Sequence, residues 1–211
     1  DSNRYTLIGL LQRLGCSVLD LGLVPDDPAL LQAAFEHAAS QADAIISSGG
    51  VSVGEADHTR AMLHQIGEMV FWRVAMRPGR PLATGRIAHP ARSRPAIVFG
   101  LPGNPVAVMV TFLAFVRPAL LQLMGCSTPP SPLLQARSLE MLRKKPGRTE
   151  YQRGWVSRNE QGQLQVRTTG NQGSGVLSSM TQANGLIVLH HQQATVEAGE
   201  WVDVMMFDGV I

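Results

Sequence analysis

The chain has 211 residues, of which 45% are hydrophobic and 16% charged, so it can bury one large or two modest cores and is not a disordered tail. Its formal net charge of +2 is too small for a dedicated nucleic-acid binder. Cys16 and Cys126 are far apart and show no CxxC or Cys/His spacing, which argues against a disulfide framework or a structural zinc site and favours the reducing cytoplasm. No apolar run approaches the about 18 consecutive residues of a membrane span. The first residues, beginning at Asp1 without a Met, are expected to be a helix N-cap in a truncated chain.

The first part of the chain alternates helical and strand patterns. Apolar positions at helical spacing predict a helix over Ser2–Leu14, and a β-rich run follows at Ser17–Val24. A second helix is expected over Pro28–Ser40, with Asp27 as its N-cap, before a buried strand at Ala42–Ser47. This order predicts an α/β domain with a mostly parallel sheet and helices on both faces.

The predicted elements then continue to a proline-rich break. A third helix is expected over about Asp57–Ile66, and a long apolar helix follows Pro105 to about Met124. Between them lie three predicted strands: Val70–Met76, Pro81–Ile87 and Ala96–Gly100. The prolines of residues 127–132 place a domain boundary there, giving an α/β domain over 1–129.

Residues 130–211 show short strands separated by turns. This pattern predicts a small all-β domain, a barrel or a sandwich, that closes with a strand at Glu200–Phe207. Two polar patches, Tyr151–Gly154 and Gln172–Gly175, are typical of ordinary loops when taken by themselves.

Two loops that follow buried strands carry most of the functional information. Residues 47–57 (SSGGVSVGEAD) and 101–105 (LPGNP) both place glycines and backbone N–H groups before a helix, where an anion binds favourably. Because loops after parallel strands meet at the carboxyl edge of the sheet, we expect both to form one site for a phosphate-bearing molecule. Its candidate binding residues are Ser48, Gly49, Gly50, Ser52, Gly54, Pro102, Gly103, Asn104 and Pro105.

Glu55 and Asp57 lie on the lip of the first loop and would repel an anion unless a hard cation such as Mg²⁺ lay between them. A metal–phosphate site is therefore one interpretation. The other is that Asp57 only caps its helix and the glycines only form the turn, and the spacing does not decide between the two.

A serine hydrolase is the rival interpretation, because Gly50–Gly54 matches the G-x-S-x-G pattern with Ser52 as the nucleophile. A catalytic triad needs an acid followed by a histidine, yet the only aspartates after Asp57 are Asp203 and Asp208, both beyond the last histidine. No HGGG-like oxyanion loop is present, so this alternative is disfavoured.

Arg73, Arg77 and Arg80 cluster around a predicted strand and turn. On a regular strand Arg73 and Arg77 would project to the same face, where they would bind oxyanions. A solvated sheet edge explains the same pattern, and completion of the ligand pocket is the alternative.

In the same order along the chain, seven segments resemble the molybdopterin molybdotransferases, the family of bacterial MoeA and the gephyrin E domain. They are DSNR (1–4), DDP (26–28), SSGGVSVGEAD (47–57), MRPGRP (76–81), LPGNP (101–105), YQRG (151–154) and TGNQGS (169–174). The resemblance covers nearly the whole chain. It implies a molybdopterin-binding domain followed by a C-terminal β-barrel, and an N-terminal region of the family, including the first strand of the sheet, that is missing here.

The resemblance also implies an activity. Adenylated molybdopterin and molybdate would give molybdenum cofactor and AMP with the help of a divalent cation, in a cytoplasmic homodimer that works with the pathway's adenylyltransferase. No nucleic-acid or membrane partner is implied. A non-catalytic peptide-binding scaffold of the same fold is the alternative, and the adenylylating sister enzyme would lack the β domain.

Carried over residue by residue, Asp27 and Asp57 correspond to the family's essential acidic residues, with Glu55 as a further metal ligand. Arg73 and Arg77 replace lysines that are common in the family, which puts an acid role for these positions in doubt because a guanidinium keeps its proton at neutral pH. The resemblance adds Arg80, Arg153 and Ser174 to the substrate-binding set.

Overall fold

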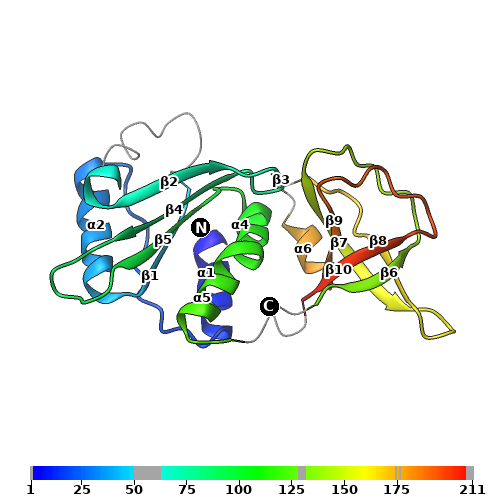
Figure 1. Cartoon of the computed structure of the whole chain (residues 1–211), viewed down its shortest axis with the longest axis horizontal. Helices are drawn as coiled ribbons and strands as arrows, with labels where there is room; N and C mark the ends of the chain where they lie inside the picture. Colours follow the sequence, from blue (N-terminus) through cyan, green and yellow to red (C-terminus); the bar gives the residue numbers. More distant parts are fainter. Residues whose placement is uncertain (1, 50–62, 128–131, 174, 176, 208–211) are drawn as a thin grey trace. The chain divides into compact units, whose positions relative to one another are not determined.

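The computed structural model describes residues 2–49, 63–127, 132–173, 175 and 177–207. The chain forms two compact units (Figure 1). Unit 1 comprises Asp1–Val74 and Gly79–Gly125, and unit 2 comprises Ala75–Pro78 and Cys126–Ile211. The short segment between Val74 and Gly79 thus leaves the first unit, contributes to the second and returns.

Unit 1 begins with two helices, α1 (Ser2–Arg13) and α2 (Pro28–Gln41). As predicted, Asp27 caps α2, because its Oδ1 accepts hydrogen bonds from the backbone N–H groups of Ala29 (2.9 Å) and Leu30 (3.0 Å). The strand predicted between the helices, at Ser17–Val24, is wrong: this segment has no regular secondary structure and pairs with no strand in the described part of the chain. A β pattern predicts a strand only where a partner edge is available to bond its backbone groups.

The sheet of unit 1 has four strands in the order β1-β5-β4-β2. Their bounds are Ala44–Ser48 (β1), Glu68–Arg73 (β2), Pro81–Ile87 (β4) and Ala96–Leu101 (β5). Only β1 and β5 are parallel, whereas β2–β4 and β4–β5 are antiparallel. The sheet is therefore mixed, and the prediction of a mostly parallel sheet is wrong. The segments joining β2, β4 and β5 are too short for the crossover that a parallel pair requires.

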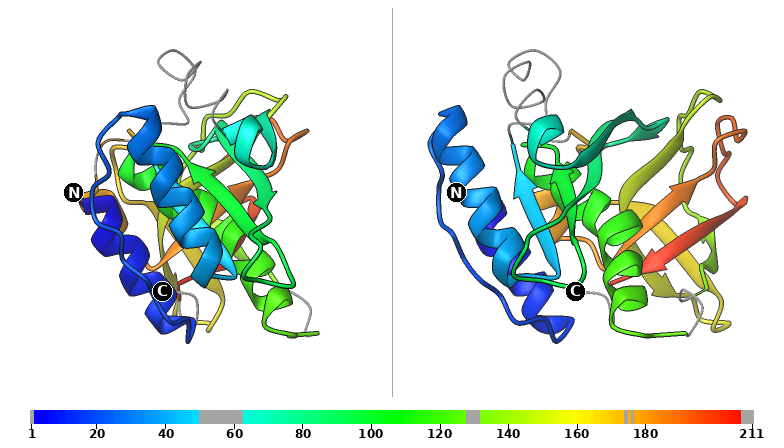
Figure 2. Two further views of the ribbon diagram at one scale, coloured as in Figure 1. Left: turned by 90° about the vertical axis from the view of Figure 1, so that its left-hand side faces the viewer. Right: turned by 60° about the vertical axis from the view of Figure 1, so that its left-hand side comes forward.

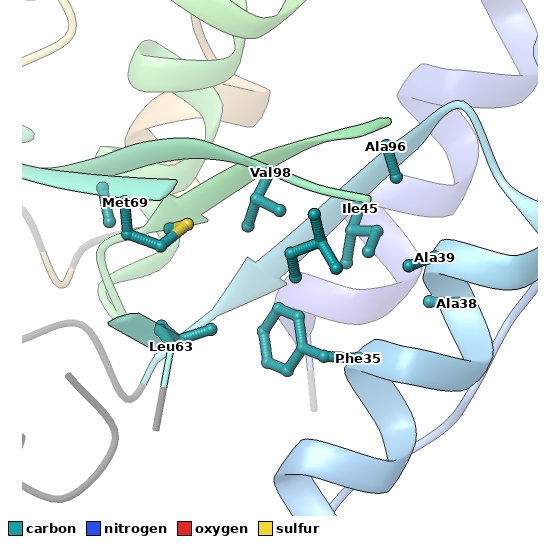
Figure 3. Close-up of a cluster of buried hydrophobic side chains, with 10 residues drawn as sticks. Phe35, Ala38, Ala39, Ile45, Leu63, Met69, Ala96 and Val98 are labelled. Atoms are coloured by element: carbon teal, nitrogen blue, oxygen red, sulfur yellow. The ribbon is translucent and has the colours of Figure 1, made fainter. Parts of the chain in front are cut away.

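One core of unit 1 lies between α2 and the sheet (Figure 3). Phe35, Ala38 and Ala39 of α2 meet Ile45 of β1 and Val98 of β5, which pair across the parallel ladder. Ala38 and Ala39 keep α2 close to the strands, and Phe35 fills the space beyond them. Removal of this apolar surface from water stabilises the unit, since burial contributes roughly 25 cal/mol per Å².

The opposite face of the sheet is covered by α1 and by a long helix built from three segments (Figure 2). These are α4 (Pro105–Thr111), the π-helical turn η1 (Phe112–Val116) and α5 (Arg117–Leu123), which agree with the long helix predicted after Pro105. Pro118 cannot donate a backbone hydrogen bond, and the wider π turn just before it accommodates that loss. By length and composition alone, this helix is the one in the described part of the chain that can cross a membrane, but 56% of its apolar window is buried inside the protein, as in a core helix.

Unit 2 is a closed β-barrel, as predicted from the short-strand pattern. Strands β7, β8, β6, β10 and β9 pair in that order, and β9 pairs again with β7. Their bounds are Leu134–Ser138 (β6), Thr149–Arg158 (β7), Leu164–Thr168 (β8), Gly185–Leu189 (β9) and Trp201–Met206 (β10). Closure leaves no free edge among these five strands. A short helix, α6 (Ser178–Thr181), precedes β9.

The strand predicted at Val70–Met76 divides between the two units. Strand β2 ends at Arg73, and β3 (Met76–Arg77) pairs in parallel with Thr149–Glu150 at the start of β7. The prediction that Arg73 and Arg77 share one face of one strand is therefore wrong. Spacing along the chain does not reveal that a strand leaves its sheet partway.

Candidate functional site

The loops after β1 and β5 lie side by side. Ser48 pairs with Leu101 in the parallel register, and the N–H of Gly49 donates to the carbonyl of Leu101 at 3.2 Å. A Cβ atom added to Gly103 would lie 3.7 Å from the Cα of Gly49. The described part of the first loop, Ser48 and Gly49, thus lies beside the second loop at one edge of the sheet, as predicted, and residues 50–57 lie outside the described residues. We call this edge, made of Ser48, Gly49 and residues 102–105, the loop edge.

Helix N-termini gather at the loop edge. Asn104 caps α4, since its Oδ1 accepts from the N–H of Ala107 at 3.5 Å, and Pro105 occupies the first turn as predicted. A two-residue connection joins α2 to β1, and the two elements run in opposite directions. Helix α2 therefore also begins at the end of the sheet where β1 finishes (Figure 2). The positive dipole end of α4 favours an anion at this edge, whereas the first N–H groups of α2 are already bonded to the Asp27 carboxylate.

Asn3 is a third contributor that sequence reasoning did not single out. Its Nδ2 donates to the Oγ of Ser48 at 3.0 Å and to the carbonyl oxygen of Gly103 at 2.8 Å. The amide therefore ties the first turn of α1 to both loops at once. The sequence feature that could have indicated Asn3 is its place in the DSNR segment, one of the segments that carry the family resemblance.

Several predicted site residues lie outside the described residues. They are Gly50, Ser52, Gly54, Glu55, Asp57 and Ser174. Asp27, the third predicted metal ligand, is exposed, and its Oδ1 is engaged in capping α2, which leaves Oδ2 for a cation. Within the ranges that the structure describes, no group of three or more His, Cys, Asp or Glu side chains forms a metal site.

The three predicted arginines separate between the units. Arg73 and Arg80 belong to unit 1, and Arg77 belongs to β3 of unit 2. All three side chains are exposed, and none forms a salt bridge within the described part of the chain. Their charges are available to a ligand from solvent.

Arg153, in contrast, is a buried cation of unit 2, only 1% exposed. Its Nε donates to the Oγ of Ser179 at 3.0 Å, and its Nη2 donates to the carbonyl oxygens of Gly173 (3.0 Å) and Asn171 (3.4 Å). It makes no salt bridge to a carboxylate among the described residues of unit 2. Burial lowers the pKa of this guanidinium, and the nearby charge of Arg77 lowers it further.

The main chain of Arg153 is fixed by Gln172. The Gln172 Oε1 accepts from the Arg153 N–H at 2.7 Å, and its Nε2 donates to the Arg153 carbonyl at 3.1 Å. Tyr151–Gly154 is therefore part of strand β7, and the interpretation of this patch as an ordinary loop is wrong. We call Arg153, Arg77 and the segment 171–173 the arginine seat. Arg77 pairs in register with Glu150, whose carboxylate accepts from Arg148, and neither Arg77 nor Arg153 forms a salt bridge within the described residues.

The family comparisons agree with this two-part organisation. Residues 1–122 match the model for a probable molybdopterin binding domain, and residues 135–207 match the model for the MoeA C-terminal region, domain IV. The chain belongs to the MoeA and gephyrin family. Both loops of the loop edge fall within the first match, and Arg153 falls within the second.

Curated relatives of this family member extend the match. The chain is 43% identical over 212 residues to a molybdopterin molybdenumtransferase of Haemophilus influenzae, covering 100% of this chain and 51% of that protein. It is 35% identical over 208 residues to one of Nostoc sp., covering 97% and 47%. The chain thus spans about half the length of these relatives.

Solved structures show the same fold. A molybdenum cofactor biosynthesis protein from Pyrococcus furiosus aligns with a TM-score of 0.73 and 28% identity over 98% of this chain and 64% of that one. A molybdopterin biosynthesis MoeA protein from Pyrococcus horikoshii aligns with a TM-score of 0.74 and 26% identity over 97% and 47%.

Proposed function

We propose that the protein containing this chain is a molybdopterin molybdotransferase, which inserts molybdenum into adenylated molybdopterin and releases AMP. The observation that carries the proposal is a pair of regions whose groups are suited to anions: the loop edge of unit 1 and the arginine seat of unit 2. The named activity of the relatives needs both a phosphorylated ligand and an oxyanion, and each region suits one of them.

The loop edge is suited to the phosphate of the pterin ligand. Gly49 and Gly103 bring bare backbone close together, Asn104 and Pro105 begin a long helix, and Ser48 adds a hydroxyl. These groups bind an anion through neutral donors that are already in place, so little reorganisation is needed on binding. Gly50, Ser52 and Gly54, which lie outside the described residues, are proposed as further phosphate-binding residues, with Pro102 shaping the pocket.

The arginine seat is suited to molybdate. The Nη1 of Arg153 has no hydrogen-bond partner within the described residues, and Arg77 presents a second guanidinium from β3. A doubly charged oxyanion would balance these two charges and accept charge-assisted hydrogen bonds. Ser174, which lies outside the described residues, is proposed as a further hydroxyl donor, and Arg73 and Arg80 of unit 1 are proposed as further positive charges of the substrate-binding set.

We further propose that Asp57, with Glu55 and Asp27, holds a divalent cation such as Mg²⁺ at the phosphoanhydride. The free Oδ2 of Asp27 is compatible with that role. When bound, the cation would supply charge stabilisation to the leaving AMP. The residues of the chain bind and orient both substrates, and the guanidinium groups of Arg73 and Arg77 act as fixed charges.

The full protein is proposed to be a cytoplasmic homodimer that receives its adenylated substrate from the adenylyltransferase of the pathway. A non-catalytic scaffold is the second candidate that the family allows. The two are distinguished by turnover, because a scaffold binds its ligand without releasing AMP.

The test is AMP release from adenylated molybdopterin in the presence of molybdate and Mg²⁺. The unsubstituted protein is expected to release AMP in step with molybdenum insertion. The Asp57→Ala variant is expected to lose metal-dependent release while its circular dichroism and unfolding midpoint stay unchanged. Full turnover by the Asp57→Ala variant would refute the assignment of Asp57, and an inactive unsubstituted protein would favour the scaffold.

A further inference from the structure

The two hydrogen bonds of Asn3 span long stretches of the chain. Ser48 ends β1 and Gly103 precedes α4, yet a single side-chain amide reaches both. No other side chain in the described part of unit 1 is recorded as hydrogen-bonding to both loops of the loop edge. This position gives Asn3 control over two groups that would face a bound phosphate.

The orientation of the amide follows from chemistry. The carbonyl of Gly103 can only accept, so the NH₂ end of Asn3 must face it, and the Oδ1 end cannot. The same NH₂ group reaches Ser48, and therefore the serine Oγ acts as the acceptor in that bond. The serine hydroxyl keeps its own proton for another partner.

Both consequences favour an anion. With one of its two oxygen lone pairs accepting from Asn3, the Ser48 hydroxyl keeps its proton, which has no hydrogen-bond acceptor among the described residues. With its oxygen bonded by Asn3, the Gly103 carbonyl no longer presents an unsatisfied acceptor at the start of α4. An anion site needs donors that point inward and no bare carbonyl oxygen beside them.

We propose that Asn3 is a positioning residue of the loop edge, which holds the Ser48 hydroxyl as a hydrogen-bond donor to the substrate phosphate. The inference rests on the phosphate-binding part of the proposed function. Asn3 itself need not touch the phosphate, because it acts through Ser48 and through the Gly103 carbonyl.

The oxygen of the Asn3 amide suggests an informative substitution. The Oδ1 of Asn3 is buried and has no hydrogen-bond partner in the described structure. An aspartate at this position would lose the donor to both loops and would place a negative charge beside the phosphate. Asn3→Asp should therefore weaken anion binding more than Asn3→Ala does.

The experiment is calorimetric titration with inorganic pyrophosphate, which measures anion binding without turnover. Asn3→Ala and Ser48→Ala are each expected to weaken pyrophosphate binding about 10-fold, the size expected from one charge-assisted hydrogen bond. The double variant is expected to lose less affinity than the product of the two single losses, because the part of the Asn3 effect that passes through Ser48 is already lost in Ser48→Ala. Gln12→Ala, an exposed change on the same helix, is the matched control and should bind like the unsubstituted protein.

Two results would overturn the proposal: unchanged affinity in Asn3→Ala, or a double variant whose loss equals the product of the two single losses. The product would mean that Asn3 acts independently of Ser48, as a general structural support would. Pyrophosphate binding with the expected coupling but no AMP release would reject the molybdotransferase and keep the role of Asn3. Absence of pyrophosphate binding by the unsubstituted protein would reject the role of Asn3, whatever the turnover.

Discussion

The loop edge of unit 1 and the arginine seat of unit 2 are both suited to anions, but they use different physics. The loop edge offers neutral donors: glycine backbone, a serine hydroxyl and helix N-termini. The arginine seat holds a buried positive charge whose recorded partners are carbonyl and hydroxyl oxygens. A neutral site costs little stability when empty, whereas a buried charge remains costly until a counter-ion arrives.

This difference suits the two proposed ligands. A phosphate that belongs to a large pterin molecule gains affinity from the rest of that molecule, so neutral donors suffice. Free molybdate has only its four oxygens to offer, and fixed guanidinium charges compensate for its small size. Substitutions in the two regions should therefore have different effects on ligand binding and on folding.

The largest effect is expected from Arg153→Met. Loss of the buried guanidinium should lower molybdate-dependent AMP release by about 100-fold, as for removal of a strong donor to a developing or bound anion. Pyrophosphate affinity should stay unchanged, because Arg153 is not part of the loop edge. Steady-state assays at varied molybdate, with calorimetry for pyrophosphate, measure both. An equal loss of molybdate-dependent AMP release and of pyrophosphate affinity would contradict the distinction between the two regions.

The next effect concerns which exposed arginine acts with Arg153. Arg77 lies in the same unit as Arg153 and already lowers its pKa, whereas Arg73 belongs to the other unit. Arg77→Ala should raise the KM for molybdate by about 10-fold, the effect of one charged hydrogen bond. Arg73→Ala should change it by less than Arg77→Ala does. A larger rise in the molybdate KM for Arg73→Ala than for Arg77→Ala, measured in the same assay, would contradict the assignment of the oxyanion site to β3.

The smallest effect tests the loop edge through its backbone. Gly49 has a φ of 88°, which L-residues adopt at a cost of about 1–2 kcal/mol, so Gly49→Ala should lower the free energy of unfolding by about that amount. Gly103→Ala is the matched control, since its φ is not positive and the added Cβ meets Gly49 at an ordinary 3.7 Å. Urea denaturation of both variants compares them. Equal destabilisation would mean that the turn at Gly49 does not depend on its left-handed backbone.

Local sequence signals predicted the elements that depend on local physics. The Asp27 and Asn104 caps, the long helix after Pro105 and the barrel of short strands all follow from residue types at fixed offsets. The shared edge of the two loops also followed, because β1 and β5 are the one parallel pair in the sheet and both loops come after them. The prediction held even though the sheet as a whole is mixed.

The failures involve partners distant in sequence. Nothing near Ser17–Val24 or Arg77 says which strand will bond to the backbone there, and the first segment finds no strand while the second joins the barrel. Asn3 was missed for a similar reason, since its role depends on Ser48 and Gly103, 45 and 100 residues away. Arg153 appeared to lie in a polar loop because its burial comes from the segment at 171–179, which strand patterns do not locate.

The most direct test of the account is crystallography of the protein soaked with tungstate, a heavy oxyanion of the same shape and charge as molybdate. The account predicts an anomalous peak within hydrogen-bonding distance of the guanidinium groups of Arg153 and Arg77, and its loss in Arg153→Met crystals. A tungstate peak at the loop edge alone, or a peak that persists in the variant, would contradict the assignment of the oxyanion to the arginine seat.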